Sequence, residues 1–137
     1  MPDLVDTSVW ARKTHPLVKG WLDQALLADT VATCDMVKLE LLYSSRNVTE
    51  FETIEDELAA LRQCPIGESE WRRAIAVYRS LARQGGTHQR SVKHADLLIA
   101  AAAESSNARV VHYDEDFDRI SKVTGQPCQW VAARGSL

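Results

Sequence analysis

Short apolar runs alternate with longer amphipathic segments along this chain, and the alternation constrains the fold more than any other feature. The runs expected to form strands are Pro2–Val5, Val31–Thr33, Arg109–Tyr113 and a segment near Gln129–Val131. Strands that alternate with helices pair most simply in parallel, with the helices covering both faces of the sheet. The sequence therefore predicts an α/β fold around a parallel sheet.

The segments between these runs carry apolar residues at helical spacing. We expect helices from about Pro16 to Ala28, from Asp35 through Leu42, over Phe51–Leu61, over Trp71–Ala82, from Ser91 through Ala103, and from Asp116. Thr7-Ser8, Asp35 and Ser91 can supply N-caps, and Gly85-Gly86 can end the fourth of these helices. The segment Leu97–Ala103 is apolar nearly all round, which predicts a central, buried helix.

The size and composition are those of one globular domain over residues 1–137, with 45% hydrophobic and 26% charged residues. No run approaches the roughly 18 apolar residues of a membrane span, and the first residues do not resemble a secretory signal. We therefore expect a cytoplasmic protein without membrane contact. Cys34, Cys64 and Cys128 are odd in number and lack C-x-x-C spacing, so we expect packing residues or incidental thiols.

The net charge of −3 argues against a simple nucleic-acid-binding module. The distribution of charge is more informative, because the segment 71–95 contains no acidic residue. Its candidates for binding nucleic-acid phosphates are Arg79, Arg83, Arg90 and Lys93. An acidic stretch over 50–57 precedes this basic segment, so the alternative is a pair of solvated helix faces of opposite sign.

Four carboxylates fall where an α/β fold gathers its functional residues. Asp6 and Asp114 each follow an expected strand directly. Glu40 and Asp96 are expected near the starts of helices, where the positive end of the helix dipole favours an anion. Because ligands of parallel sheets bind at the carboxyl ends of the strands, we expect all four side chains at one edge.

Carboxylates gathered in a partly apolar setting repel one another, and a divalent cation offsets that charge. Oxygen ligands suit magnesium or manganese, and magnesium leaves room for a substrate phosphate. Bound ions can activate a water for attack on phosphorus, so no nucleophilic side chain is needed. The sequence has no G-x-S-x-G, H-E-x-x-H or P-loop motif. We therefore expect metal-dependent hydrolysis of phosphodiesters.

Four motifs in order carry a family resemblance. They are V-D-T-S ending at Ser8, the lone Glu40 in K-L-E-L-L, H-A-D-L-L-I-A-A-A-A around Asp96, and H-Y-D-E-D-F-D-R-I around Asp114. In order and spacing they resemble the PIN domain and, within it, the VapC-type toxins of bacterial toxin–antitoxin pairs. The resemblance spans almost the whole chain, including the closing Q-W-V-x-x-x-G.

The resemblance implies a three-layer sandwich with a central five-stranded parallel sheet, and a magnesium-dependent endoribonuclease in which manganese can substitute. The family's acidic catalytic positions correspond to Asp6, Glu40, Asp96 and Asp114. Asp6, Asp96, Asp114 and Asp116 correspond to metal-binding positions, and either of the last two could be the closer ligand. Ser8 matches the small hydroxyl residue that supports the first aspartate.

The resemblance also implies partners. These are a cellular RNA substrate, such as transfer or ribosomal RNA, and a cognate VapB-like antitoxin, in a homodimer, heterotetramer or larger complex. The apolar segments Leu39–Tyr43 and Phe51–Leu61 could form a groove for a helix of the antitoxin. The alternative is that the apolar residues of these segments pack in the core.

Two other functions fit parts of the sequence. A haloacid-dehalogenase-like phosphatase also begins with an aspartate after the first strand, but it would need a second aspartate where Ser8 stands. A non-catalytic protein of the same fold could bind a partner through its helices, but such proteins usually lose a carboxylate of the site. Here no carboxylate of the four is missing.

Overall fold

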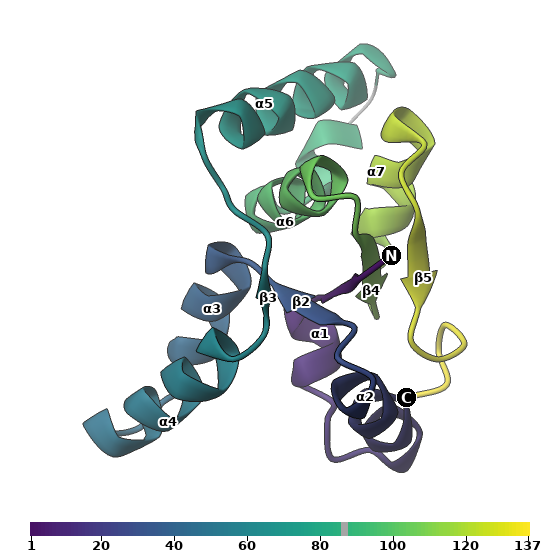
Figure 1. Ribbon diagram of the computed structural model, residues 1–137. Coiled ribbons are helices and arrows are strands. Elements are labelled where there is room, and N and C mark those ends of the chain that lie inside the picture. Colours follow the sequence, from purple (N-terminus) through teal and green to yellow (C-terminus); the bar gives the residue numbers. More distant parts are fainter. Residues whose placement is uncertain (86–87) are drawn as a thin grey trace.

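The computed structural model describes residues 1–85 and 88–137 (Figure 1). The strands are β1 (Asp3–Val5), β2 (Val31–Thr33), β3 (Arg62–Gln63), β4 (Arg109–His112) and β5 (Cys128–Trp130). The helices are α1 (Thr7–Trp10), α2 (Pro16–Leu27), α3 (Asp35–Leu42), α4 (Val48–Ala59), α5 (Glu68–Arg83), the 3-10 helix η1 (His88–Ser91), α6 (His94–Ser105) and α7 (Asp116–Thr124).

The five strands form one parallel sheet in the order β3-β2-β1-β4-β5. β1 lies at the centre, with Leu4 aligned with Ala32 of β2 and with Val110 of β4. After β1, the chain adds β2 and β3 on one side of that strand. It then crosses to the other side of β1 and adds β4 and β5. The neighbouring carboxyl ends of β1 and β4 thus form the switch point at which such sheets bind ligands. The predicted α/β fold with a five-stranded parallel sheet is confirmed.

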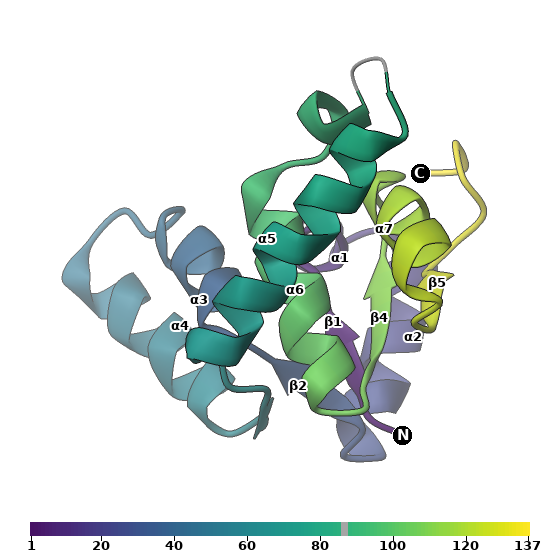
Figure 2. The ribbon, with the colours of Figure 1, turned by 90° about the horizontal axis from the view of Figure 1, so that it is seen from above.

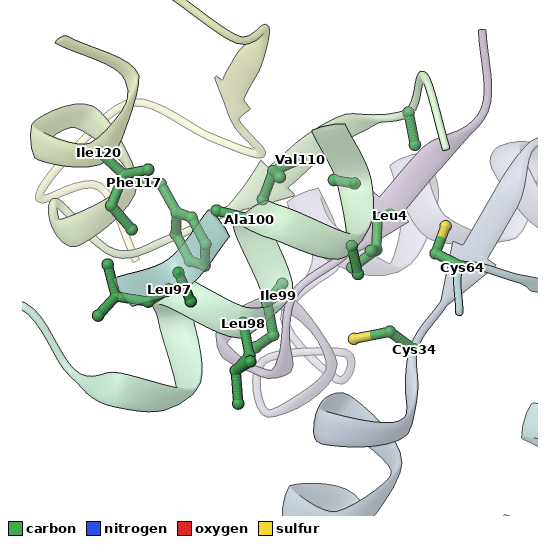
Figure 3. Packing of buried hydrophobic residues seen from close by; sticks show 14 of the residues in the cluster. Leu4, Cys34, Cys64, Leu97, Leu98, Ile99, Ala100, Val110, Phe117 and Ile120 are labelled. Carbon is green, nitrogen blue, oxygen red and sulfur yellow. The ribbon is translucent and has the colours of Figure 1, made fainter. Parts of the chain in front are cut away.

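Alternating residues of the central strands face two separate cores. Leu4 and Val110 pack in one core with residues of α6 and α7 (Figure 3), and α5 covers these two helices from outside. Val5 and Val111 pack on the opposite face, in the core that α1 and α2 cover. This alternation follows from the two-residue period of a strand, and it gives the three layers seen in Figure 1.

The central helix α6 lies over the middle of the sheet, as its composition predicts (Figure 2). All residues from Leu97 to Ala103 are buried, and the small side chains of the alanines let the helix approach its neighbours closely. α3 and α4 pack against each other and extend to one side of these layers (Figure 2). α6 therefore fixes the position of Asp96, which lies in its first turn.

Several expected helix starts are wrong by one or two residues. Asp6, not Thr7 or Ser8, is the N-cap of α1. Cys34 occupies the N-cap position of α3, so Asp35 is already helical. Ser91 ends η1, and Lys93 is the N-cap residue of α6.

Other boundaries differ by small amounts. β3 was not among the strands expected from apolar runs, because its two residues are polar and exposed. β5 begins one residue earlier than expected, at Cys128. Gly85 follows α5 with a φ of 83°, as a helix-ending glycine should, whereas Gly86 lies outside the described residues.

The cysteines are free thiols, as expected. Cys34 and Cys64 are buried in the core on the α6 side of the sheet, and Cys128 is half-buried (Figure 3). Along 1–85 and 88–137, none of the helices has both the length and the apolar character needed to cross a bilayer.

Candidate active site

Asp6 lies at the carboxyl end of β1, where the strand turns directly into α1. Its Oδ2 accepts a hydrogen bond from the backbone N–H of Ser8 at 3.0 Å, which caps the helix. Its Oδ1 is buried without a hydrogen-bond partner. Burial raises the pKa of Asp6, and the nearby charges of Glu40 and Asp114 raise it further, against the lowering effect of hydrogen bonds from Ser8. A buried oxygen without a donor is suited to a cation.

Glu40 reaches the same region from α3. Its Oε1 accepts a hydrogen bond from Thr7 Oγ1 at 2.8 Å, so the residue next to Asp6 in the sequence holds it. The expectation that Glu40 lies near a helix start is wrong, because α3 ends two residues later, at Leu42. The helix dipole therefore does not stabilise this carboxylate, and the hydroxyl of Thr7 supplies a donor in its place.

Asp96, Asp114 and Asp116 form a compact group. One oxygen from each lies within 4.8 Å of the others, a spacing that could hold a metal ion. Asp96 comes from the first turn of α6, Asp114 from the loop after β4, and Asp116 from the start of α7. Asp6 lies near enough for its charge to act on Asp96. The structure thus brings Asp96, Asp114 and Asp116 together at the carboxyl edge of the sheet. Asp6 and Glu40 lie outside this group, but their charges interact with each other, and that of Asp6 interacts with the group.

The ammonium group of Lys93 lies among these three carboxylates. Nζ donates to Asp114 Oδ2 at 2.6 Å and to Asp116 Oδ2 at 2.8 Å. It is also 3.3 Å from Asp96 Oδ2, which has no hydrogen-bond partner of its own. Although partial burial opposes the charged form, the hydrogen bonds to Asp114 and Asp116 hold the pKa of Lys93 above its ordinary value.

The pKa values of Asp96 and Asp116 shift in opposite directions. Burial and the negative charges of Asp6 and Asp114 raise the pKa of Asp96 to about 8, although the positive charge of Lys93 acts to lower it. For Asp116, burial raises the pKa, but hydrogen bonds from the side chain and backbone of Lys93 outweigh it and lower the pKa below its ordinary value. Arg119 adds a hydrogen bond to Asp116 Oδ1 at 3.0 Å. Without a metal, the site thus favours a protonated Asp96 beside an ionised Asp116.

Ser8 joins the two strands that carry the site. Its backbone N–H donates to the carboxylate of Asp6, the N-cap of α1, and its Oγ accepts a hydrogen bond from the backbone N–H of Tyr113 at 2.8 Å. The end of β1 is thereby fixed to the end of β4, directly before Asp114. A supporting role for Ser8 stays a prediction, for which these two hydrogen bonds provide a physical basis.

His112, Asp118 and Cys128 form a second group of potential metal ligands, with atoms within 4.8 Å of one another. His112 is fully buried, and its Nδ1 accepts the backbone N–H of Asp114 at 3.1 Å. Burial lowers the pKa of His112, so the ring is neutral and carries its proton on Nε2. A protonated Nε2 cannot bind a metal, and His112 instead orients the backbone that precedes Asp116.

Of the predicted phosphate-binding residues, the arginines lie on the exposed surface and the lysine lies in the acidic site. Arg79 and Arg83 are exposed on α5, and Arg90 is exposed in η1. The ammonium of Lys93 is bound to acidic side chains, although 60% of its side chain remains accessible. A role for these residues in binding RNA stays a prediction.

A groove of about 790 Å³ runs between α1, α2, α3 and α4 and shares Glu40 with the acidic site. Thr7 and Glu40 lie in its wall beside apolar residues that include Leu41 and Ile54. On the outer side of α3, Leu39 is 63% exposed and Tyr43 is 92% exposed. For these two residues, the alternative of packing in the core is therefore wrong.

Sequence reasoning missed several contacts in the site. Thr7 and Arg119 were not selected, and Lys93 was assigned to RNA alone. Two of them had a signal in the sequence, because Lys93 precedes Asp96 by three residues and Arg119 follows Asp116 by three. Such spacing places side chains on one face at a helix end. The contact of Thr7 with Glu40 is tertiary and had no local signal.

Taken together, fold and site define an α/β protein with an acidic cluster, suited to a metal ion, at the switch point of a parallel sheet. A family model described as the PIN domain matches residues 4–123. Ribonuclease VapC18 of Mycobacterium tuberculosis is 48% identical over 134 residues, which cover 97% of each chain. The chain therefore belongs to the PIN-domain family, and within it to the VapC ribonucleases.

Solved structures show the same fold. The DNA-bound VapBC of Salmonella typhimurium has a chain that matches with a TM-score of 0.74 at 18% identity, covering 96% of this chain and 99% of its own. VapBC-5 of Mycobacterium tuberculosis, a member of the VapBC family of toxin–antitoxin systems, matches with a TM-score of 0.58 at 25% identity, covering 95% and 98%. The family predicted from the sequence motifs is confirmed, and neither the phosphatase nor the non-catalytic alternative is supported.

Proposed function

We propose that this chain is a metal-dependent endoribonuclease and the toxin of a type II toxin–antitoxin pair. It would cleave cellular RNA in the cytoplasm, such as transfer or ribosomal RNA, and so arrest growth. The observation that carries the proposal is the group of Asp96, Asp114 and Asp116, whose oxygens converge on one positive charge. The name of the relative VapC18, a ribonuclease, supports the same activity.

The residues of the site fit a divalent cation. Asp6 and Asp96 each have a buried oxygen without a hydrogen-bond partner, and an ammonium already lies among the three grouped carboxylates. Asp6, Asp96, Asp114 and Asp116 would hold the ion, for which we propose magnesium, with manganese as a substitute. When bound, such an ion lowers the pKa of a water and stabilises negative charge on phosphate oxygens.

The remaining side chains position these groups. Thr7 holds Glu40 at the mouth of the groove, where its carboxylate can orient an attacking water and accept its proton. Ser8 and His112 fix the backbone on either side of Tyr113, so that Asp114 keeps its place relative to Asp6. Exposed arginines at 79, 83 and 90 would attract the phosphates of the RNA.

The groove next to the site is where we place a VapB-like antitoxin. Its apolar wall suits one face of an amphipathic helix, and its acidic end suits an arginine or lysine that reaches toward Glu40. The solved VapBC structures are of toxin–antitoxin systems, which supports such a partner. The assembly would be a homodimer or heterotetramer, and Trp71 and Ile75, both more than half exposed on α5, provide apolar surface for it.

Expression of the chain with and without its partner tests this proposal. Expressed alone, the chain should arrest growth, and mapping of RNA ends should reveal new cleavage sites. Co-expression with the small reading frame beside its gene should restore growth and yield a stable complex. Cleavage in vitro without toxicity in the cell, and without binding to any neighbour-encoded protein, would remove the toxin role and leave the nuclease.

A further inference from the structure

Lys93 occupies the point where the acidic side chains of the site converge. Its Nζ lies 2.6 Å from Asp114 Oδ2, 2.8 Å from Asp116 Oδ2 and 3.3 Å from Asp96 Oδ2. These are the same three carboxylates whose oxygens are close enough together to hold a metal ion. The chain therefore supplies a cation of its own to the site.

The two ends of Lys93 are held differently. Its backbone N–H donates to Asp116 Oδ2 at 3.1 Å, in the N-cap position of the buried helix α6. Its side chain as a whole is 60% exposed, although its ammonium group contacts the acids. The backbone is thus fixed, while the flexible four-carbon side chain has room to move into the solvent.

An ammonium group and a metal ion cannot use the same oxygens at once. Magnesium binds carboxylate oxygens at about 2.0–2.1 Å, which would bring it into repulsive contact with an ammonium at its present position. The side chain of Lys93 must leave before an ion can bind all three acids. Until then, its charge offsets the negative charge of the ionised acids that it contacts.

We propose that Lys93 is a built-in competitor of the metal: its ammonium stabilises the acidic cluster in the metal-free protein, and the metal displaces it toward the solvent. The inference rests on the proposed metal site. The displaced ammonium remains at the rim of the site, where it can pair with a phosphate of the RNA. One residue then stabilises the resting protein, lowers its affinity for metal and contacts the substrate.

Lys19 provides a matched control. Its Nζ lies 2.6 Å from Asp23 Oδ2, and its side chain is 63% exposed, so its distance and exposure closely resemble those of Lys93. It differs in pairing with one surface carboxylate on α2, away from the acidic cluster. Lys19→Met and Lys93→Met therefore remove the same charge from two similarly exposed lysine side chains, of which only Lys93 pairs with the acids of the site.

The test measures manganese binding by calorimetry and thermal unfolding in chelator, on the full chain. Lys93→Met should bind manganese about five- to tenfold more tightly, as expected on removing a competing network of ion pairs. In chelator, it should unfold several degrees below the wild type. Lys19→Met should match the wild type in both measurements, and Lys93→Arg, which keeps the charge, should bind manganese more weakly than Lys93→Met.

Equal or weaker manganese binding by Lys93→Met would overturn the inference while leaving the metal site in place. Absence of binding by every protein, including the wild type, would remove the proposed site and the inference with it. If Lys93→Met is too unstable to purify, Lys93→Gln removes the charge but keeps hydrogen-bond donors, and the same titration applies to it. Unchanged affinity in that variant would equally overturn the inference.

Discussion

Asp96→Asn should make the metal-free protein more stable at neutral pH. Asp96 is 3% exposed, and burial beside other acids raises its pKa from 3.8 to about 8. The folded state then holds a proton that the unfolded state has lost, so this group makes stability fall as pH rises from about 4 to about 8. Asparagine has no such charge to lose or gain in this pH range.

The size of the effect follows from that window. Each pH unit between about pH 4 and pH 7 costs the folded state at most about 1.4 kcal/mol through Asp96. The upper bound on the stability lost at pH 7 is therefore about 4 kcal/mol. The pKa of Asp116 moves in the opposite direction, because the two acids and Lys93 interact, so part of this penalty is offset. We expect about 2 kcal/mol of added stability for Asp96→Asn at pH 7.

Urea unfolding in chelator, followed by tryptophan fluorescence at pH 5 and pH 7, measures this difference. Asp23→Asn is the control, because the side chain of Asp23 is 54% exposed and pairs with Lys19 on the surface. The gain for Asp96→Asn should be small at pH 5 and grow toward pH 7, whereas the control should change little at either pH. A variant less stable than the wild type at pH 7, or a gain independent of pH, would refute the reasoning.

Two further predictions concern the support of the site and its ion. Ser8→Ala should destabilise the protein by about 1–3 kcal/mol and slow RNA cleavage, because the N–H of Tyr113 loses its acceptor; unfolding within about 0.5 kcal/mol of the wild type would contradict this. Calcium should support cleavage poorly compared with magnesium or manganese, because it prefers more ligands and looser geometry. Equal rates with calcium in a cleavage assay would argue against the proposed site.

The sequence predicts most of the sheet because its buried strands appear as short apolar runs. Asp6 directly follows β1, and Asp114 comes two residues after the end of β4, so a parallel arrangement brings both aspartates to one edge. β3 could not be predicted in this way. Arg62 and Gln63 have no apolar pattern, and they form a strand only because β2 offers them a free edge.

The arrangement of charges inside the site depends on tertiary contacts that spacing alone does not fix. The hydroxyl of Thr7 meets Glu40 across 33 residues of sequence, and Lys93 meets Asp114 across 21. Lys93 lies in a basic segment of the sequence, which predicts a surface that binds phosphates. The composition of that segment does not reveal which of its cations contacts a carboxylate. Lys93 contacts the acids because α6 starts beside the loop after β4.

Cleavage of RNA by the purified chain, compared with that by Asp6→Asn and Asp96→Asn at saturating magnesium, tests the central claim most directly. Each substitution removes a proposed metal-ligand charge, and its near-isosteric amide should leave the fold intact. We predict that both variants melt cooperatively and cleave RNA at least about a hundredfold more slowly, a change of several kcal/mol in the barrier. Cleavage by either folded variant at close to the wild-type rate would contradict the account.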